Sequence, residues 1–401
     1  MQYSRVIAAL AVAPLVLAVT ACSAGAGGDS ADGSVLTFWD GFTQYDADSP
    51  FGQLISTCED ETGIKIKRTS DAAVTDNLLQ SASAGSTPDL VILDNPTVAQ
   101  FAETGLLVDN ATSGLDTDGQ RENVLAAAQV DDKTYGGSLG SNTLALFYNT
   151  EKLKAADVAP PTTWDELRAA VQATTQGDTR GIAFSATNSE EGTFQFLPFF
   201  WGAGADLADL SSPEATEALQ LWTDWMQSGQ AAESNINSNQ QDVRDQFLAG
   251  GAAMMVNGTW QLGALDDAGI PYAVVPIPAI DGGPAPSPLG GEFIEVVASD
   301  EKTQAASADF AQCFIDPENA RAWIEGQNYI SPYPDEAEAQ AEANPALRPW
   351  VDAVAAAYGR TSDLGSEYPI ASQAIWTAMQ ESLTGAKTPS EALETAQKSL
   401  D

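Results

Sequence analysis

An alternation of apolar runs and amphipathic stretches at the start of the chain constrains the fold most. Three runs rich in β-branched, aromatic or aliphatic residues enclose two stretches with apolar residues at helical spacing; in chain order these segments are 35–39, 51–62, 64–68, 74–84 and 90–93. Gly63 stands where the first helix should stop. Strands that alternate with helices form largely parallel sheets, with ligand-facing residues at their carboxyl ends. The pattern therefore predicts an α/β fold with a mainly parallel sheet flanked by helices.

The length of 401 residues suits two lobes better than one. A second series of elements begins at the apolar run 144–148, and further helices are expected to start at Thr163 and at Ser212-Pro213. Strands are expected at 252–256 and 293–298, and helices at 303–314, 370–383 and from 388 onward. The sequence shows no internal repeat.

The composition excludes several classes of function. The formal net charge is −39, from 56 Asp and Glu against 17 Lys and Arg, so nucleic acid is not an expected partner. The absence of histidine excludes Ser-His-Asp and Cys-His catalysis and histidine metal sites. No nucleotide-binding or complete calcium-loop motif is found, so we expect no cofactor and no metal. A glycosidase with two carboxylates passes this filter.

The N-terminus carries a second strong pattern. Arg5 is followed by an uncharged segment, 6–17, then by Leu17-Ala18-Val19-Thr20-Ala21-Cys22 and a run of small residues. This order resembles the lipobox of bacterial lipoprotein precursors, in which the cysteine is acylated and becomes the new N-terminus. It predicts a signal peptide over 1–21, a lipid anchor at Cys22 with a tether to residue 34, and a position on the extracytoplasmic face of the cell membrane. The alternative is an ordinary secretory signal cleaved near Ala21.

Two further cysteines, Cys58 and Cys313, remain in the mature chain. In an exported protein, two cysteines most simply form one disulfide bond. Two unpaired buried thiols are the alternative, and the residues alone leave it open.

Several short sequence phrases follow one another along almost all of residues 35–400. One is the turn that contains Gly258 and Trp260, and another is Pro88-Asp89 before an apolar strand. The phrases lie at 36–40, 51–66, 87–94, 133–136, 146–150, 161–167, 251–260 and 383–393. Each phrase alone is common, but in this order they resemble the extracellular solute-binding proteins of carbohydrate ABC importers, the class that includes maltose- and oligosaccharide-binding proteins.

The resemblance implies a two-lobed periplasmic-binding-protein-like fold with a ligand cleft between the lobes. It implies a monomeric, non-enzymatic substrate-binding component that captures an oligosaccharide by lobe closure and delivers it to the transmembrane subunits of an ABC permease. The first lobe would comprise 35–140 and 289–332, and the second 141–288 and 333–401. Crossovers are expected near 139–143, 288–292 and 331–335. On this map both Cys58 and Cys313 fall on helices of the first lobe, which favours the disulfide.

One position departs from the family. A proline usually follows the residues that match Tyr135-Gly136, whereas this chain has Gly137-Ser138. We therefore expect a hinge of different shape or flexibility.

A sugar needs aromatic platforms and planar hydrogen-bonding groups. In the first lobe, Trp39, Asp40 and Phe42 follow the first strand, and Asp94 and Asn95 follow the apolar strand, so all five are candidate ligand contacts. The alternatives are core packing for Trp39, a turn acid for Asp40, and a helix cap for Asp94 and Asn95.

In the second lobe, Trp260 matches the family's sugar-stacking tryptophan and is the leading candidate. Asn257 is either an amide partner or a turn residue before Gly258. Asn142 and Glu292 lie at expected crossovers, and Trp201 either lines the cleft or fills the core. Tyr329 and Tyr368 complete the set. The other tryptophans are expected in the core: Trp164, Trp222, Trp225, Trp323, Trp350 and Trp376.

Three other functions remain open at this stage. The same architecture could bind a polyamine, a peptide or an oxyanion, although few Arg or Lys stand among the candidates. A secreted glycosidase and a purely structural surface protein are the other two.

Overall fold

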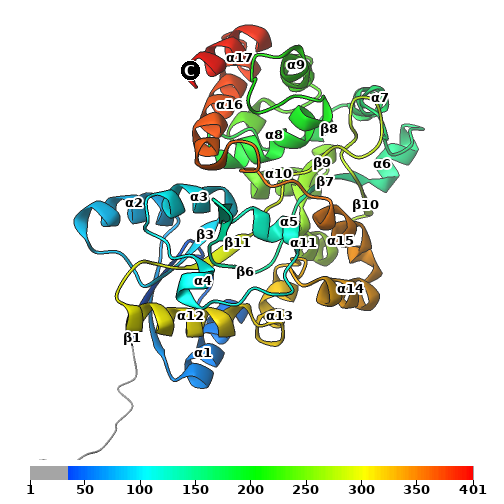
Figure 1. The fold of residues 1–401 in the computed structure, drawn as a ribbon. Helices are drawn as coiled ribbons and strands as arrows, with labels where there is room; N and C mark the ends of the chain where they lie inside the picture. The colour runs from blue at the N-terminus through cyan, green and yellow to red at the C-terminus, as the bar shows by residue number, and fades with distance from the viewer. Residues whose placement is uncertain (1–34, 401) are drawn as a thin grey trace, which may run out of the picture. The chain divides into compact units, whose positions relative to one another are not determined.

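The computed structural model describes residues 35–400 and contains two large sheets, each covered by helices, and a two-stranded sheet of β4 (Gln129–Val130) and β5 (Lys133–Thr134) (Figure 1). Cys22, the tether and the signal segment lie outside the described residues. Within the described part, no helix is both long and apolar enough to span a membrane. Mixed helices and strands in two sheets confirm the predicted α/β class.

The first sheet has the strand order β2-β1-β3-β11-β6. Its members are β1 (Val35–Asp40), β2 (Lys65–Ser70), β3 (Leu90–Asp94), β11 (Glu292–Val296) and β6 (Gly137–Ser138). β1 pairs in parallel with β2 and β3, as the alternation predicts, whereas β11 pairs antiparallel with β3 and β6. The sheet is therefore mixed, because β11 enters from a distant part of the chain instead of through a crossover helix.

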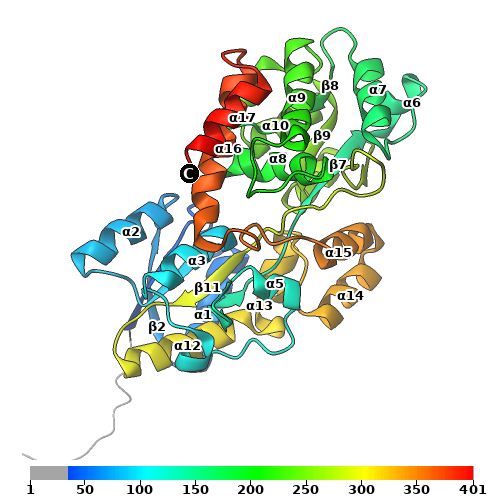
Figure 2. The same cartoon turned by 45° about the horizontal axis from the view of Figure 1, so that its top comes forward.

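Helices cover both faces of this sheet (Figure 2). One face packs on α1 (Pro50–Thr62), α12 (Glu301–Ile315) and α13 (Pro317–Gly326), with Phe38, Phe51 and Phe314 in mutual contact. The other face packs on α2 (Val74–Ala84) and α3 (Asn95–Glu103). The small elements between β3 and β6 are α4 (Asn110–Ser113), α5 (Glu122–Ala126), β4 (Gln129–Val130) and β5 (Lys133–Thr134).

Cys58 on α1 and Cys313 on α12 form a disulfide bond, with their Cα atoms 5.6 Å apart. The two helices lie side by side, and both sulfur-bearing side chains are buried in the same apolar cluster. The alternative of two unpaired thiols therefore does not hold in this structure.

The second sheet has the strand order β10-β7-β9-β8. Its members are β7 (Leu144–Asn149), β8 (Arg180–Ala183), β9 (Ala252–Gly258) and β10 (Tyr272–Val275). Only β8 and β9 are parallel, so the expectation of a mainly parallel sheet is wrong here. β9 follows β8 by way of helices, whereas β7 runs in the opposite direction to both of its neighbours, β9 and β10. Every residue of β9 is buried.

Helices surround this sheet as well. An apolar cluster joins it to α7 (Trp164–Thr174), α8 (Glu190–Gly202), α9 (Pro213–Gln227), α16 (Tyr368–Leu383) and α17 (Pro389–Lys398). Starts that the sequence predicts are present, because Thr163, Ser212 and Thr388 each cap the helix that follows. The remaining helices are α6 (Thr150–Ala155), α10 (Gln240–Leu248), α11 (Leu262–Ala268), α14 (Pro334–Ala343) and α15 (Arg348–Ala355), with short 3₁₀ turns η1 (Glu233–Ile236), η2 (Thr259–Gln261), η3 (Pro345–Leu347) and η4 (Gly365–Glu367).

Most of the tryptophans lie where the sequence places them. Trp164, Trp222, Trp225, Trp323 and Trp350 are buried in the core. Trp376 differs, since it is only half-buried on α16.

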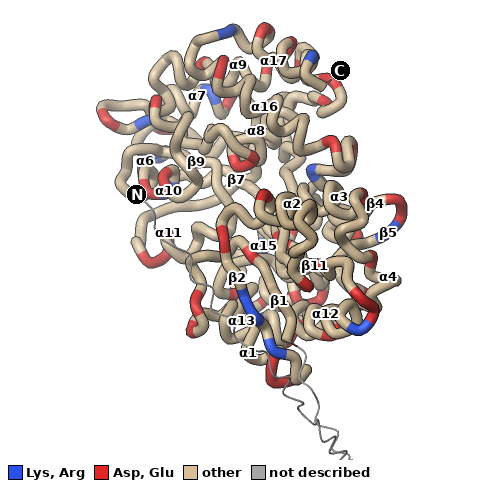
Figure 3. Tube along the Cα trace, turned by 90° about the vertical axis from the view of Figure 1, so that its left-hand side faces the viewer, with Lys and Arg blue, Asp and Glu red and all other residues tan. Residues whose placement is uncertain are grey.

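Asp and Glu are spread along the described chain and Lys and Arg are sparse (Figure 3).

Three chain segments meet between the two sheets. Ser141 and Ile330 exchange two backbone hydrogen bonds of 2.8 Å, and Asn142 and Gly290 exchange two more of 3.0 and 2.9 Å. A Cβ atom on Gly290 would lie 2.1 Å from the Asn142 Oδ1 atom, so a larger residue there would force the Asn142 side chain to move. We propose these segments as the crossovers and hinge between a first lobe, built on the β2-β1-β3-β11-β6 sheet, and a second lobe, built on the β10-β7-β9-β8 sheet.

Candidate functional site

A cavity of about 450 Å³ lies where the ends of the two sheets and the three segments meet. Its volume falls within the ~300–1,000 Å³ usual for small-ligand sites. It is lined by side chains from strand ends, helices and loops around both sheets, and by the backbone of Gly290 and Gly291. The lining side chains are Phe42, Gln44, Tyr45, Asp94, Asn142, Glu190, Glu191, Phe194, Gln240, Gln241, Arg244, Trp260, Gln261, Glu292, Gln327, Tyr329 and Arg360.

Trp260 and Phe194 form the apolar wall on the second lobe's side. Trp260 lies on η2 directly after β9, and its ring centroid is 6.3 Å from that of Phe194 on α8. A Cβ atom on Gly258 would lie 2.1 Å from the Trp260 ring. The glycine two residues before the tryptophan therefore allows the indole to lie over the backbone, which explains the local sequence.

A second group of aromatic side chains faces the cavity from the first lobe. Phe42 and Tyr45 follow β1 and pack on Trp323 of α13, with centroid distances of 5.1 and 5.2 Å. The Tyr45 hydroxyl donates a 2.6 Å hydrogen bond to Gln327 Oε1. The ring of Tyr329 packs edge-on against the same tryptophan. Trp323 thus fixes the aromatic side chains of this wall from behind.

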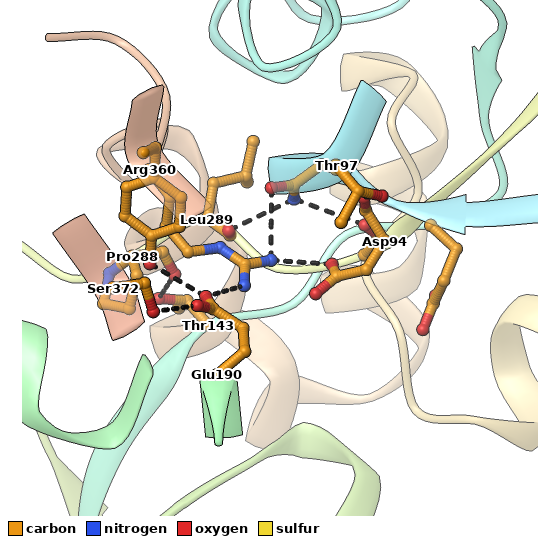
Figure 4. A network of polar contacts seen from close by, with 12 residues as sticks. Asp94, Thr97, Thr143, Glu190, Pro288, Leu289, Arg360 and Ser372 are labelled. Carbon is orange, nitrogen blue, oxygen red and sulfur yellow. Dashed lines mark hydrogen bonds and ion pairs between the residues drawn. The ribbon is translucent and has the colours of Figure 1, made fainter. Parts of the chain in front are cut away.

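Asp94 connects this wall to the second lobe through Arg360 (Figure 4). The Arg360 NH2 group donates to Asp94 Oδ1 at 2.6 Å and to Asn95 Oδ1 at 3.1 Å, while NH1 donates to Glu190 Oε1 at 2.7 Å. Asp94 occupies the N-cap position of α3, but its side chain makes no capping bond. The Asp94 side chain therefore does not cap α3, which was the alternative to a ligand contact.

Burial and charge act against each other on this buried pair. Burial disfavours the charged guanidinium, but Asp94 and Glu190 more than offset it, and the pKa of Arg360 is raised above its ordinary value. Burial raises the pKa of Glu190, while Arg360 and a hydrogen bond from Ser372 act in the opposite direction. The Tyr368 hydroxyl donates a further 2.8 Å bond to Glu190. Glu190 thus accepts from three protein donors, which leaves it little free acceptor capacity.

Glu292 differs from Glu190 because one of its carboxyl oxygens has no hydrogen-bond partner among the described residues. It stands directly opposite Asp94 in the β3–β11 register, and Tyr329 approaches its Oε1 atom at 3.5 Å. Within residues 35–400, its Oε2 atom has no hydrogen-bond partner. Burial, then the nearby Asp94 carboxylate, raises the pKa of Glu292 to about 8. Glu292 therefore carries a proton in this site near neutral pH and can both donate and accept.

Amides supply the remaining polar surface. No side-chain hydrogen bond is found within residues 35–400 for Gln44, Gln241 or Asn142, so these groups face the cavity with free donors and acceptors. Glu191 accepts 2.7 Å bonds from the Ser185 hydroxyl and the Gln240 backbone, and burial raises its pKa. Arg244 bonds Asp245 and Gln261.

Six of the twelve side chains predicted from the sequence line this cavity: Phe42, Asp94, Asn142, Trp260, Glu292 and Tyr329. Trp39 and Asp40 line a different cavity, of about 420 Å³, beside α2. Asp40 is fully buried and bonds Arg68 at 2.6 and 2.8 Å, and its Oδ1 atom also accepts from the Phe42 backbone two residues further on, as a turn acid does. The half-buried Trp39 packs against the cluster on the α2 and α3 side of the sheet.

The other four support the site or lie away from it. Asn95 is buried and donates to the Leu289 and Gly291 carbonyls, and Tyr368 is buried against Glu190. Asn257 is buried on β9 and donates to the Gln240 carbonyl at 2.9 Å, so it is neither a turn residue nor a cavity group. Trp201 packs edge-on against Tyr358, 5.3 Å away.

Sequence reasoning missed Arg360, Glu190, Phe194, Tyr45 and the glutamines of α10. Arg360 had a detectable signal, because a cation is rare in this acidic chain. The glutamines of α10 carry no such signal in the sequence, because polar residues that bind a ligand and polar residues of an exposed helix face cannot be told apart there. Among the described residues, no cluster of His, Cys, Asp and Glu fit to hold a metal ion is found.

Comparisons with known proteins match both the sequence and the overall fold of this chain. A family model described as "Bacterial extracellular solute-binding protein" matches residues 53–349. The maltodextrin-binding protein of Bacillus subtilis is 24% identical over 344 residues, covering 80% of this chain and 79% of that protein. A maltooligosaccharide ABC transporter solute-binding lipoprotein of Streptococcus pneumoniae is 24% identical over 72% of this chain and 70% of its own length. The GacH receptor of Streptomyces glaucescens, solved with acarbose, superposes with a TM-score of 0.77 at 25% identity, covering 91% and 97% of the two chains.

Proposed function

Because the chain belongs to the family of bacterial extracellular solute-binding proteins, we propose that its solute is a carbohydrate, most simply an oligosaccharide. The protein would be the substrate-binding component of a carbohydrate ABC importer and would pass its ligand to the permease's transmembrane subunits. The expectation of a binding protein, not an enzyme, is confirmed by the family match and by the relatives.

The observation that carries the proposal is the pairing of aromatic faces with open polar groups across one cavity. Trp260 and Phe194 offer an apolar face to one side of a sugar ring. Asp94, Glu292, Asn142 and the glutamines offer acceptors and donors to its hydroxyls. The cavity's two arginines are bonded to protein groups, which disfavours an anionic solute.

Lobe closure would complete the site. Because the cavity is lined from both lobes, a ligand that contacts both walls favours the conformation that brings them together. A closed, loaded protein would then be the form presented to the permease.

The proposed location rests on the N-terminal pattern and on the relatives. The family is extracellular, and one relative is named a lipoprotein. We propose acylation at Cys22, which lies outside the described residues. Cys22→Ser should release the protein from the membrane fraction while its affinity for ligand stays unchanged; retention in that fraction would argue against the anchor.

A thermal-melt screen tests the proposed function. A ligand that binds the native state raises the melting temperature through RT ln(1 + [L]/Kd), about 2.7 kcal/mol at one hundred times Kd. We expect a shift with one or more of glucose, maltose, maltotriose, maltotetraose and acarbose at millimolar concentration. Spermidine, a tripeptide and sulfate serve as controls. If a control compound raises the melting temperature and no sugar does, the carbohydrate proposal is wrong and the solute belongs to the class of that control.

A further inference from the structure

Arg360 is the one side chain of the network in Figure 4 that bonds both walls of the cavity. It lies in the segment between α15 and η4 and is only 2% exposed. Its guanidinium contacts the end of β3 through Asp94 and Asn95 and the start of α8 through Glu190. Its Cζ atom also stands 4.9 Å from the Phe194 ring centroid. A cation thus links the first lobe's carboxylate to the second lobe's apolar wall.

The bonds leave Asp94 half occupied. Arg360 takes the Oδ1 atom, no side-chain bond to Oδ2 is found within residues 35–400, and the Asp94 side chain is 44% exposed. Glu190, by contrast, accepts from Arg360, Tyr368 and Ser372 and has little left to offer. Arg360 therefore fixes the direction in which the open oxygen of Asp94 faces the cavity.

We propose that Arg360 is a positioning residue for ligand binding, which holds Asp94 and Phe194 at a fixed spacing across the cavity. It acts through these two side chains and not by taking the ligand itself. The planar, always charged guanidinium suits this task, because its two NH groups can bond two carboxylates in different directions. A lysine would keep the charge but could not reproduce both directions. The role in binding rests on the proposed function.

Arg360 also balances the charges around Glu292. The groups that face Glu292 are Asp94 on the adjacent strand, Tyr329 and Arg360, with Glu190 behind the arginine. Like charges directly opposite each other on paired strands repel. Without the guanidinium, Asp94 would act on Glu292 unopposed, and the pKa of Glu292 would rise further.

Titration with maltotriose tests the binding role. Arg360→Met should weaken binding about 30-fold, and Arg360→Lys should recover part of that loss. Arg348→Met is the matched control, because it removes an exposed arginine that also bonds a carboxylate, Glu338, with both NH groups. Its affinity should stay within about twofold of the wild type. Binding by Arg360→Met within twofold of the wild type would overturn the proposal.

A ligand-free measurement separates this proposal from the proposed function. In protein labelled with ¹³C at glutamate carboxyls, the Glu292 resonance, assigned with Glu292→Gln, should titrate at higher pH in Arg360→Met than in Arg348→Met, and the shift should be smaller in Arg360→Lys, which keeps the charge. A purely structural role would leave that titration unmoved and would overturn the proposal. If the wild type binds no sugar but the titration moves, the proposed function fails while the coupling of Arg360 to Glu292 stands.

Discussion

Two aspartates that end neighbouring parallel strands differ in what surrounds them. Asp40 ends β1 and Asp94 ends β3, and each bonds one arginine, Arg68 and Arg360 respectively. Asp40 accepts from Arg68 at both oxygens and also from the Phe42 backbone and the Ser70 hydroxyl, and it is 0% exposed. Asp94 gives Arg360 one oxygen and keeps a side chain that is 44% exposed.

The difference shows that the carboxyl end of a strand marks a candidate position but does not assign its role. The number of protein donors decides whether a carboxylate has capacity left for a ligand. Asp40 has none left and orders the loop that carries Phe42 and Tyr45. Asp94 has one oxygen left, and that oxygen faces the cavity. We therefore propose that the first aspartate contributes to stability and the second to ligand binding.

The largest effect is expected at Asp40. Asp40→Ala leaves Arg68 with its carboxylate removed in a largely buried site, which should lower the free energy of unfolding by about 3–5 kcal/mol. Chemical denaturation of the ligand-free protein measures it. Lys65→Ala, which removes an exposed ion pair on β2, the strand of Arg68, should change stability by less than about 1 kcal/mol. An equal cost for both variants would remove the distinction between a closed and an open carboxylate.

Trp260 tests the apolar wall. Trp260→Ala should weaken sugar binding by about 1–3 kcal/mol while the protein remains folded, because the ring faces the cavity. Trp201→Ala, at a half-buried ring outside the cavity, is the control and should leave the affinity unchanged. Calorimetric titration of both variants measures the difference. Loss of the fold in Trp260→Ala would assign that ring to the core.

Asp94→Asn is the binding counterpart of the Asp40 substitution. Replacing the open carboxylate oxygen should cost about 1–2 kcal/mol of ligand affinity, since hydrogen bonds to charged groups contribute more than neutral ones. The ligand-free melting temperature should fall less than in Asp40→Ala. If Asp94→Asn binds as tightly as the wild type, the open oxygen has no part in recognition.

Glu292 gives the smallest effect, seen in pH dependence. Its pKa is about 8 in the folded protein, above the ordinary value of 4.5, so the folded chain holds an extra proton between these values. Its contribution to stability is therefore present below pH 4.5 and lost as the pH rises toward 8. The free energy of unfolding should therefore fall between pH 4.5 and 8 by about 1 kcal/mol less in Glu292→Gln than in the wild type. This value takes into account that solvent in the cavity screens the charge.

Denaturant titrations at pH 5, 6.5 and 8 measure how steeply the free energy of unfolding falls with pH. Glu295, a buried acid on the same strand with a raised pKa, also contributes to this slope, and its contribution remains in the variant. Identical slopes for wild type and Glu292→Gln would show that Glu292 does not hold a proton in the folded state.

The strands and the helix starts could be predicted because they depend on local patterns. The apolar run that became β3 and the proline-led starts at Ser212 and Thr388 lie where expected. The antiparallel entry of β11 could not be predicted, because it depends on where a distant segment returns to the sheet.

The site was predictable where the sequence carries a specific signal, and not elsewhere. Trp260 was found through its resemblance to the family's sugar-stacking tryptophan, and the structure adds that the missing side chain of Gly258 accommodates the ring. Arg360 was missed because its partners are 266 and 170 residues away along the chain. For the same reason Asp40 and Asp94 looked alike, since donors brought by tertiary contacts are not visible in the flanking residues.

The structure of the complex with the sugar that gives the largest melt shift tests the central claim most directly. We predict a sugar ring against Trp260, a hydroxyl within hydrogen-bonding distance of the Asp94 carboxylate, and an unchanged Asp40–Arg68 pair. A sugar bound beside Trp39 in the other cavity, with Asp94 free, would contradict the account.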